Sequence, residues 1–174
     1  MNYKMMGKFI SQILFVEAAF MLPALLLSIV YGEQSAVRGF IGAIIITLIV
    51  AAIMYVLCRN AVKRFYAREG LVCVGMSWIA LSIMGCLPFF ISREIPDFLG
   101  ALFEIVSGFT TTGSSILTDV EALSHGLLYW RSFSHWLGGM GVLVFLLAVV
   151  TRDRGGSGFT MHILRAESPG PNVG

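Results

Sequence analysis

Four long apolar stretches, separated by short polar segments, dominate the pattern of the chain. They cover residues 9–31, 39–57, 70–92 and 129–151. Each is close to the length of about 20 residues that a helix needs to cross a bilayer. The first stretch is too long for the apolar core of a signal peptide, contains Glu17 and Pro23, and is followed by no small-residue cleavage site. The pattern therefore predicts four membrane-spanning helices.

A shorter apolar stretch, residues 98–109, lies between the third and fourth predicted spans. It is too short to cross a bilayer, and the Gly/Thr/Ser run that follows it has poor helix propensity. We expect a half-length helix followed by irregular backbone. Such backbone is tolerated at membrane depth only where it lines a water-filled cavity or is buried in protein. This is the plan of a re-entrant pore loop.

The placement of the basic residues distinguishes a crossing segment from a re-entrant one. Cytoplasmic flanks collect Lys and Arg. If residues 98–116 return to the side from which they enter, nine basic residues lie inside and three outside. The inner set is Lys4, Lys8, Arg59, Lys63, Arg64, Arg68, Arg152, Arg154 and Arg165, and the outer set is Arg38, Arg93 and Arg131. This asymmetry favours the re-entrant loop and predicts that both termini are cytoplasmic.

Composition agrees with this membrane topology. The chain has 174 residues, of which 57% are hydrophobic and 13% charged, and its mean hydropathy is +0.84. Soluble domains carry about 25% charged residues, so the composition disfavours a soluble enzyme, a disordered tail and a nucleic-acid-binding module. The three cysteines form no C-x-x-C motif and suggest neither a disulfide framework nor a zinc site. We predict an all-α polytopic membrane protein.

The run from Ser107 to Ser115 (SGFTTTGSS) carries the most specific chemistry. A potassium filter replaces the water shell of the ion with rings of backbone carbonyl oxygens. Successive carbonyls can point inward when one residue adopts a positive φ at low cost, which is the role of glycine, and we expect this of Gly113. A phosphate-binding loop is excluded because Ser114 occupies the position of its lysine.

Three motifs in order give the chain a specific resemblance. They are FEIVSGFTTTG (103–113), HWLGGMG (135–141) and RAESPGP (165–171). Together they resemble the TrkH-type potassium uptake proteins of the Trk/Ktr/HKT superfamily. The resemblance implies a leading helix pair in residues 1–69 and a first M1–pore–M2 repeat in 70–151. The pore helix would span about 98–109, the filter 110–114, and a cytoplasmic segment 152–174.

The same resemblance implies a function, potassium uptake across a bacterial inner membrane. It assigns the filter to Thr110, Thr111, Thr112 and Gly113, with the carbonyls of Thr111 and Thr112 as the best K⁺ ligands. It implies no organic cofactor, and the near-neutral balance of 12 Lys and Arg against 10 Asp and Glu implies no nucleic-acid partner. The expected partners are three further pore repeats, a second copy in a homodimer, a cytosolic TrkA-type nucleotide-binding subunit and the lipid bilayer. Because only one repeat is present, we expect a fragment that does not conduct alone.

Other polar residues leave a second class of function open. An intramembrane hydrolase or a metal-dependent membrane enzyme would use Glu17, Glu104, His125 and His135, which would have to converge at one depth. Glu104 lies in the predicted pore helix, where we expect it to brace the filter backbone with a partner. For Glu17 we expect a structural partner on a neighbouring helix, with an ion or proton role as the alternative. Glycines 138, 139 and 141 are expected to allow close approach between helices.

Overall fold

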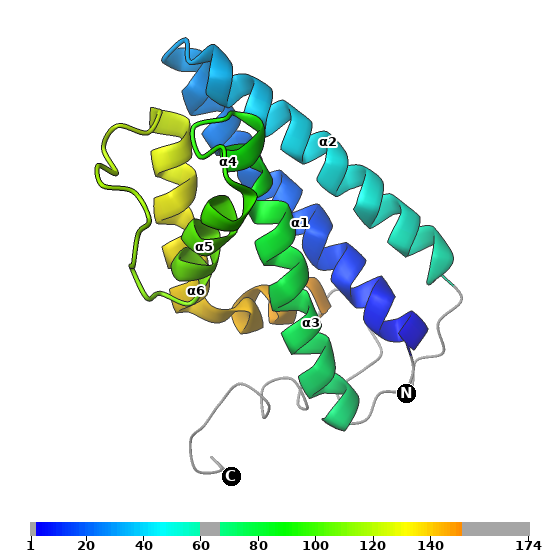
Figure 1. The fold of residues 1–174 in the computed structure, drawn as a ribbon. Helices are drawn as coiled ribbons and strands as arrows, with labels where there is room; N and C mark the ends of the chain where they lie inside the picture. Colours follow the sequence, from blue (N-terminus) through cyan, green and yellow to red (C-terminus); the bar gives the residue numbers. More distant parts are fainter. Residues whose placement is uncertain (1–2, 60–66, 151–174) are drawn as a thin grey trace.

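The computed structural model describes residues 3–59 and 67–150, without the side chains of 67–71 and 142–150. All regular structure in these residues is helical (Figure 1). The helices are α1 (Tyr3–Val30), α2 (Gln34–Leu57), α3 (Ala67–Gly85), α4 (Leu87–Ile91), α5 (Phe98–Phe109) and α6 (His125–Val150). The all-α prediction is therefore confirmed.

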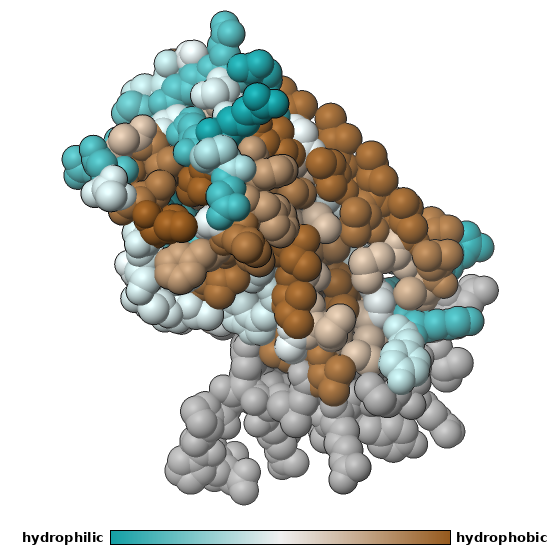
Figure 2. All heavy atoms as spheres, viewed as in Figure 1, coloured by the Kyte–Doolittle hydropathy of each residue, from teal (hydrophilic) through white to brown (hydrophobic). Residues whose placement is uncertain are grey.

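The first two helices form an antiparallel hairpin that turns at Gly32, whose φ is +71°. Three described helical segments are long and apolar enough to cross a membrane: Tyr3–Val30, Gln34–Leu57 and Val72–Ile91. Figure 2 shows a continuous hydrophobic face over α2 and α3, with hydrophilic residues gathered around the turn between α1 and α2. The first three predicted spans are thus present, and the first begins at Tyr3 rather than at residue 9.

The third predicted span, 70–92, is interrupted. The helix stops at Gly85 and resumes at Leu87 as the short α4. Pro88 has no backbone N–H, and its ring clashes with the carbonyl of the residue four positions earlier, which is Met84. The proline therefore ends α3 and sits in the first turn of α4, where it is tolerated.

The half-length helix is α5. Asp97 caps it by accepting a hydrogen bond from the Gly100 N–H at 2.9 Å. The helix has 12 residues, and residues 110–124 then return to the end of the molecule where α4 ends and α6 begins (Figure 1). The expected order of long helix, half-helix, irregular return and long helix is present.

The fourth predicted span, 129–151, corresponds to α6 but differs from it in two ways. The helix begins earlier, at His125, and it is broken at Gly141, where φ is +71° and ψ is 143°. Figure 1 shows α6 changing direction at this break. A positive φ in a helix interior requires glycine, so the third glycine of HWLGGMG ends the straight part of α6.

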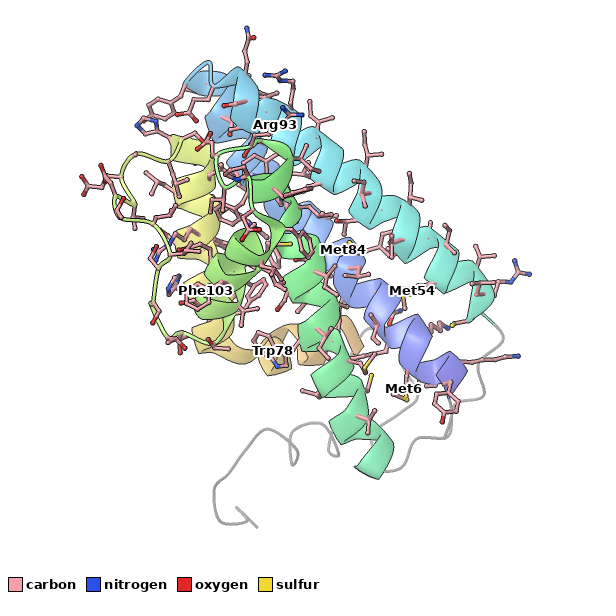
Figure 3. All side chains as sticks on the ribbon, viewed as in Figure 1. Met6, Met54, Trp78, Met84, Arg93 and Phe103 are labelled. Carbon is pink, nitrogen blue, oxygen red and sulfur yellow. The ribbon has the colours of Figure 1, made fainter. Side chains whose placement is uncertain are left out.

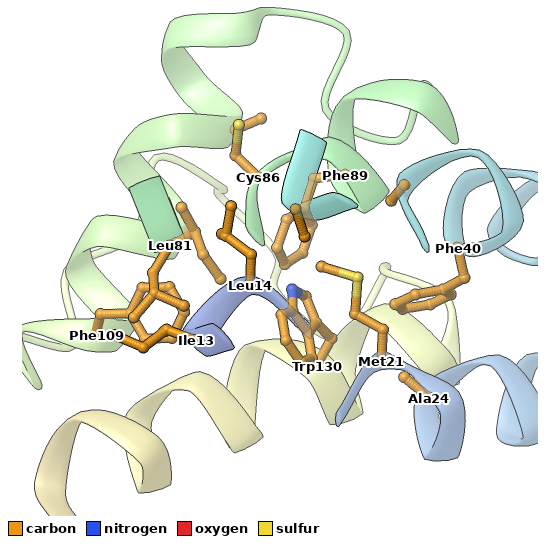
Figure 4. Packing of buried hydrophobic residues seen from close by; sticks show 14 of the residues in the cluster. Ile13, Leu14, Met21, Ala24, Phe40, Leu81, Cys86, Phe89, Phe109 and Trp130 are labelled. Carbon is orange, nitrogen blue, oxygen red and sulfur yellow. The ribbon is translucent and has the colours of Figure 1, made fainter. Parts of the chain in front are cut away.

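The core contains residues of all six described helices, including Phe40 of α2 (Figure 4). Trp130 is its largest fully buried side chain, and its indole N–H donates to the Gly85 carbonyl oxygen at 2.9 Å. Met21, Phe89 and Leu14 are also fully buried. This core fixes α6 against the hairpin and against the end of α3, and so positions α5 between them.

Two carboxylates bind backbone N–H groups at and just before the start of α6. Glu33, in the turn between α1 and α2, accepts from the backbone N–H of His125 at 2.8 Å and of Gly126 at 3.3 Å. Glu94 accepts from the Ser124 N–H at 2.8 Å. Negative charge is favourable at a helix N-terminus, where these donors have no partner within the helix. We call Glu33, Glu94 and the start of α6 the carboxylate cap.

The carboxylate cap predicts an acid-sensitive contribution to stability. Partial burial alone would raise the pKa of Glu33, but the His125 and Gly126 N–H groups and the His125 imidazole lower it below its ordinary value. Because the folded state has the lower pKa, the stabilisation is present above the pKa of the unfolded chain. It is lost as the pH falls through the pKa of the folded state.

We therefore expect Glu33→Gln to lower the thermal unfolding midpoint at neutral pH. A weakened cap should lower the free energy of unfolding by about 0.5–2 kcal/mol. The difference from wild type should shrink in acid. Thermal unfolding over a pH series measures it. Glu121→Gln changes an exposed carboxylate in the 110–124 return and is the control. It should change neither the unfolding midpoint nor its dependence on pH. An equal deficit for Glu33→Gln at all pH values would contradict the assignment.

Candidate functional site

The chain makes a tight turn directly after α5, and its N–H groups are used within the turn. Thr110 donates to the Val106 carbonyl at 2.9 Å, and Thr112 donates to the Ser107 carbonyl at 3.0 Å. The Thr110 hydroxyl also donates to Val106 and lies 2.8 Å from the Thr112 hydroxyl. The end of α5 therefore continues into the Thr-Thr-Thr-Gly segment as one hydrogen-bonded unit.

Two residues of this turn have left-handed backbone. Gly113 has a φ of +75°, as expected, and Thr111 has a φ of +56°, which the sequence did not predict. A positive φ is uncommon for a β-branched residue, and strained backbone of this kind clusters at functional sites. The segment is thus held in a conformation that threonine does not favour.

The carbonyl oxygens of the turn divide into two groups. The Thr110 carbonyl accepts from the Thr111 hydroxyl at 2.7 Å, and the Ser114 carbonyl accepts from the Ser107 hydroxyl at 2.6 Å. Within the described part of the chain, no hydrogen bond ends on the carbonyls of Thr111, Thr112 or Gly113. All four filter residues are exposed. Chemically, such a segment offers main-chain oxygens to a cation.

Glu104 ties the return of the loop to α5 and α6. One carboxylate oxygen accepts from the Ile116 N–H at 2.6 Å and from the Ser115 hydroxyl. The other oxygen accepts from the Arg131 guanidinium Nε at 3.0 Å. The Glu104 side chain is 0% exposed and that of Arg131 16%. A buried carboxylate with three donors is strongly held, so Glu104 fixes the backbone just after the turn.

Glycines allow α6 to lie directly against the end of α5. A Cβ on Gly138 would overlap the Phe109 carbonyl oxygen and lie 2.7 Å from the carbonyl carbon. A Cβ on Gly108 would overlap the Ser134 hydroxyl. Trp78 of α3 packs edge-on against Phe109 with ring centroids 5.9 Å apart, and Figure 3 shows it between α3 and α6. The backbone that leads into Thr110 is therefore packed on two sides.

The four residues of the enzyme alternative do not form one site. Their polar partners are Arg131 Nε for Glu104, Glu33 for His125, the Arg131 carbonyl oxygen for His135, and none in the described residues for Glu17. No group of three or more His, Cys, Asp or Glu that could hold a metal ion occurs in the described residues. The arrangement does not favour a hydrolase or a metal-dependent enzyme.

Arg131 was missed as a site residue by the sequence reasoning, which only counted it among the outer basic residues. A signal was available. Arg131 is the one Lys or Arg inside the apolar stretch 129–151, and an ionisable group at such a position needs a partner. Glu104 was already assigned to brace the filter with a partner, so the two could have been paired.

Comparison with known proteins identifies the family. The family model TrkH, described as a cation transport protein, matches residues 37–170. The Trk system potassium uptake protein TrkH of Halomonas elongata is 32% identical over 173 residues, covering 98% of this chain. The Trk system potassium uptake protein TrkG of Escherichia coli is 34% identical over 153 residues, covering 87% of this chain.

The fold comparison agrees. The crystal structure of the potassium transporter TrkH from Vibrio parahaemolyticus matches with a TM-score of 0.78 and 26% identity, covering 95% of this chain and 36% of that one. This chain also covers 35% of the Halomonas protein and 30% of the E. coli protein, so it spans about a third of the length of these relatives. The matched proteins are membrane transporters and not enzymes, and the chain belongs to the TrkH family of cation transport proteins.

Proposed function

We propose that this chain takes part in potassium uptake across a bacterial inner membrane. It supplies the leading helix pair, residues 1–69, and the first M1–pore–M2 repeat, residues 70–151, of a transporter with further repeats. The observation that carries the proposal is the Thr-Thr-Thr-Gly turn at the end of α5, which is held from behind by Glu104. Relatives that match nearly the whole chain are named potassium uptake proteins.

In this mechanism the ion is selected by dehydration against main-chain oxygens. The carbonyls of Thr111 and Thr112 coordinate K⁺, and the positive φ of Gly113 lets the backbone turn after them. The threonine hydroxyls shape the wall by bonding within the turn. One repeat provides about a quarter of each ring in a four-repeat filter, so residues 1–174 do not conduct alone.

The proposed partners cover surfaces that this chain leaves open. Leu99 and Phe103 on α5 are 71% and 48% exposed, and three further repeats would pack around α5 and the filter. A second copy of the transporter and a cytosolic TrkA-type nucleotide-binding subunit complete the proposed assembly. Both termini, including residues 152–174, are cytoplasmic, and this last segment lies outside the described residues.

A chimaera tests the function. This chain replaces the segment that it matches in the Vibrio parahaemolyticus TrkH, and K⁺ uptake is measured in a strain deficient in potassium uptake. We expect the chimaera to restore K⁺-dependent growth and residues 1–174 alone to leave it at background. A chimaera that reaches the membrane in normal amounts but takes up no K⁺ would overturn the proposal, and selective flux through the chain alone would overturn the need for further repeats.

The topology has its own test. Alkaline phosphatase fused after Gly174 is expected to be inactive because it stays in the cytoplasm. Inserted after Val120, in the 110–124 return, it should be active. Strong activity of the Gly174 fusion would mean that residues 98–116 cross the membrane.

The filter assignment predicts unequal tolerance at two neighbouring positions. A Cβ at Gly113 meets no atom within 4 Å, so Gly113→Ser introduces backbone strain of roughly 1–2 kcal/mol without a packing clash. We expect the ratio of K⁺ to Na⁺ uptake in the chimaera to fall before total uptake does. Thr111→Ser keeps the hydroxyl and should retain most selectivity, and Thr111→Val should be intermediate. If Gly113→Ser remained selective while Thr111→Ser did not, side chains would be the ligands.

A further inference from the structure

Glu17 is a buried carboxyl group that the proposed filter mechanism does not use. It lies in the middle of α1 and is 2% exposed. Neither of its carboxylate oxygens has a hydrogen-bond partner in the part of the chain that the structure describes. The burial is complete within this chain, so no further domain is needed to remove Glu17 from solvent. Among these described residues, the expectation of a partner on a neighbouring helix is not met.

The carboxyl group lies behind the pore helix. Its Oε1 atom is 2.9 Å from the position that a Cβ on Gly85 would occupy. The same position is 3.0 Å from Ile105 Cγ1 and 3.3 Å from Phe109 Cε2. Glu17 therefore contacts the end of α3 at the point where the last two turns of α5 pack against it. Phe109 is the residue directly before the Thr-Thr-Thr-Gly turn.

No described charge compensates Glu17 at this junction. On the α3–α4 side the facing titratable group is Cys86, whose thiol donates to the Ile83 carbonyl. On α5 the ionisable group is Glu104, which is bonded to Arg131 of α6. The other ionisable side chains of α6 are Tyr129, His125, which is bonded to Glu33, and His135, whose Nδ1 lies 2.8 Å from the Arg131 carbonyl oxygen. An isolated ionised carboxylate in an apolar site is far more costly than a neutral carboxyl. In the conformation seen here, Glu17 therefore carries a proton.

We propose that Glu17 is a proton-binding site behind the pore helix, and that its neutral form holds α3 and α5 together. Ionisation draws water to the carboxylate and separates Gly85 from Ile105 and Phe109. The displacement reaches the filter because Phe109 is continuous with Thr110. The packing of the filter is thereby coupled to the protonation of Glu17. This coupling rests on the proposed function. The proton site itself does not rest on it.

Infrared difference spectroscopy tests the site directly, with the full 174-residue chain in lipid nanodiscs. Wild type should show the carbonyl stretching band of a protonated carboxyl, and Glu17→Gln should lack it. Glu121→Gln is the matched control and should keep the band. Absence of the band from wild type at neutral pH, or its survival in Glu17→Gln, would overturn the proposal whether or not the chain transports ions.

The pH profile of K⁺ uptake in the chimaera tests the coupling. Glu17→Gln keeps the shape and the neutral state of the protonated side chain. K⁺ uptake by this variant should therefore stay within about twofold across the pH range measured. Wild-type uptake should fall as Glu17 ionises, by about tenfold for each pH unit beyond the midpoint. Identical profiles for wild type and Glu17→Gln would overturn the coupling. A chimaera without any uptake fails the proposed function and leaves the infrared result to decide the proton site.

Discussion

Replacing Glu104 with alanine is expected to destabilise the protein by about 3–5 kcal/mol, the range for breaking a buried ion pair by removing one partner. The Arg131 guanidinium loses its carboxylate, and the Ile116 N–H and the Ser115 hydroxyl lose their acceptor. The backbone at Ser115 and Ile116 then loses its attachment to α5. K⁺ uptake in the chimaera should fall to background, and the thermal unfolding midpoint should fall with it.

A double-mutant cycle separates the ion pair from the general loss of a side chain. Arg131→Leu alone leaves Glu104 buried with two neutral donors, and the double variant leaves no unpaired charge. We expect the double variant to be less destabilised than the sum of the single variants, as is found for residues in one network. Asp119→Ala, in the exposed return loop, should have little effect on stability. Strict additivity of Glu104→Ala and Arg131→Leu would contradict a direct interaction.

Replacing Gly138 with alanine is the second change with a large expected effect. The new Cβ would overlap the Phe109 carbonyl oxygen and lie 3.0 Å from the Phe109 Cα. These are backbone atoms, so they cannot move aside as a flexible side chain can. Overpacking of this kind costs about 1–3 kcal/mol. We expect a loss of K⁺ selectivity beyond what the stability change explains, because the displaced backbone leads directly into Thr110.

The neighbouring glycine provides a matched control. A Cβ on Gly139 would have its nearest atom, Thr111 Cγ2, at 3.9 Å, which is an ordinary contact. Gly139→Ala should therefore be tolerated and gain up to about 1 kcal/mol from the higher helix propensity of alanine. The measurement is the K⁺ to Na⁺ uptake ratio and the unfolding midpoint of both variants. Equal effects of the two substitutions would show that the contact with Phe109 is not the cause.

The long helices could be predicted from the sequence because membrane spans are determined by length and apolarity alone. The half-length α5 could also be predicted, since its short apolar stretch and the Gly/Thr/Ser run that follows it are local features. The break at Gly141 could not, because three glycines in HWLGGMG are equally able to adopt a positive φ. Gly138 contacts Phe109, and Gly141 ends the straight part of α6. The sequence does not distinguish these roles, because they depend on how α6 packs against α5.

The candidate site could likewise be predicted from the sequence only in part. Gly113 was predicted to have a positive φ because glycine alone does so at low cost. Thr111 was not, since nothing in its own side chain favours that backbone, and it is held there by the turn around it. The environment of Glu17 was also beyond the sequence. A glutamate in a span signals a need for a partner, but whether a partner is present depends on the packing of α3 and α5.

The carboxylate cap has a consequence for how the protein is assembled during synthesis. The groups that cap α6 come from Glu33 and Glu94, which are 92 and 30 residues earlier in the chain than their partners His125 and Ser124. The hairpin of α1 and α2 and the end of α4 leave the ribosome before α6 does. They therefore present a ready acceptor surface, and α6 completes its first turn only when it arrives there. The order of synthesis is thus also the order in which this part of the fold becomes stable.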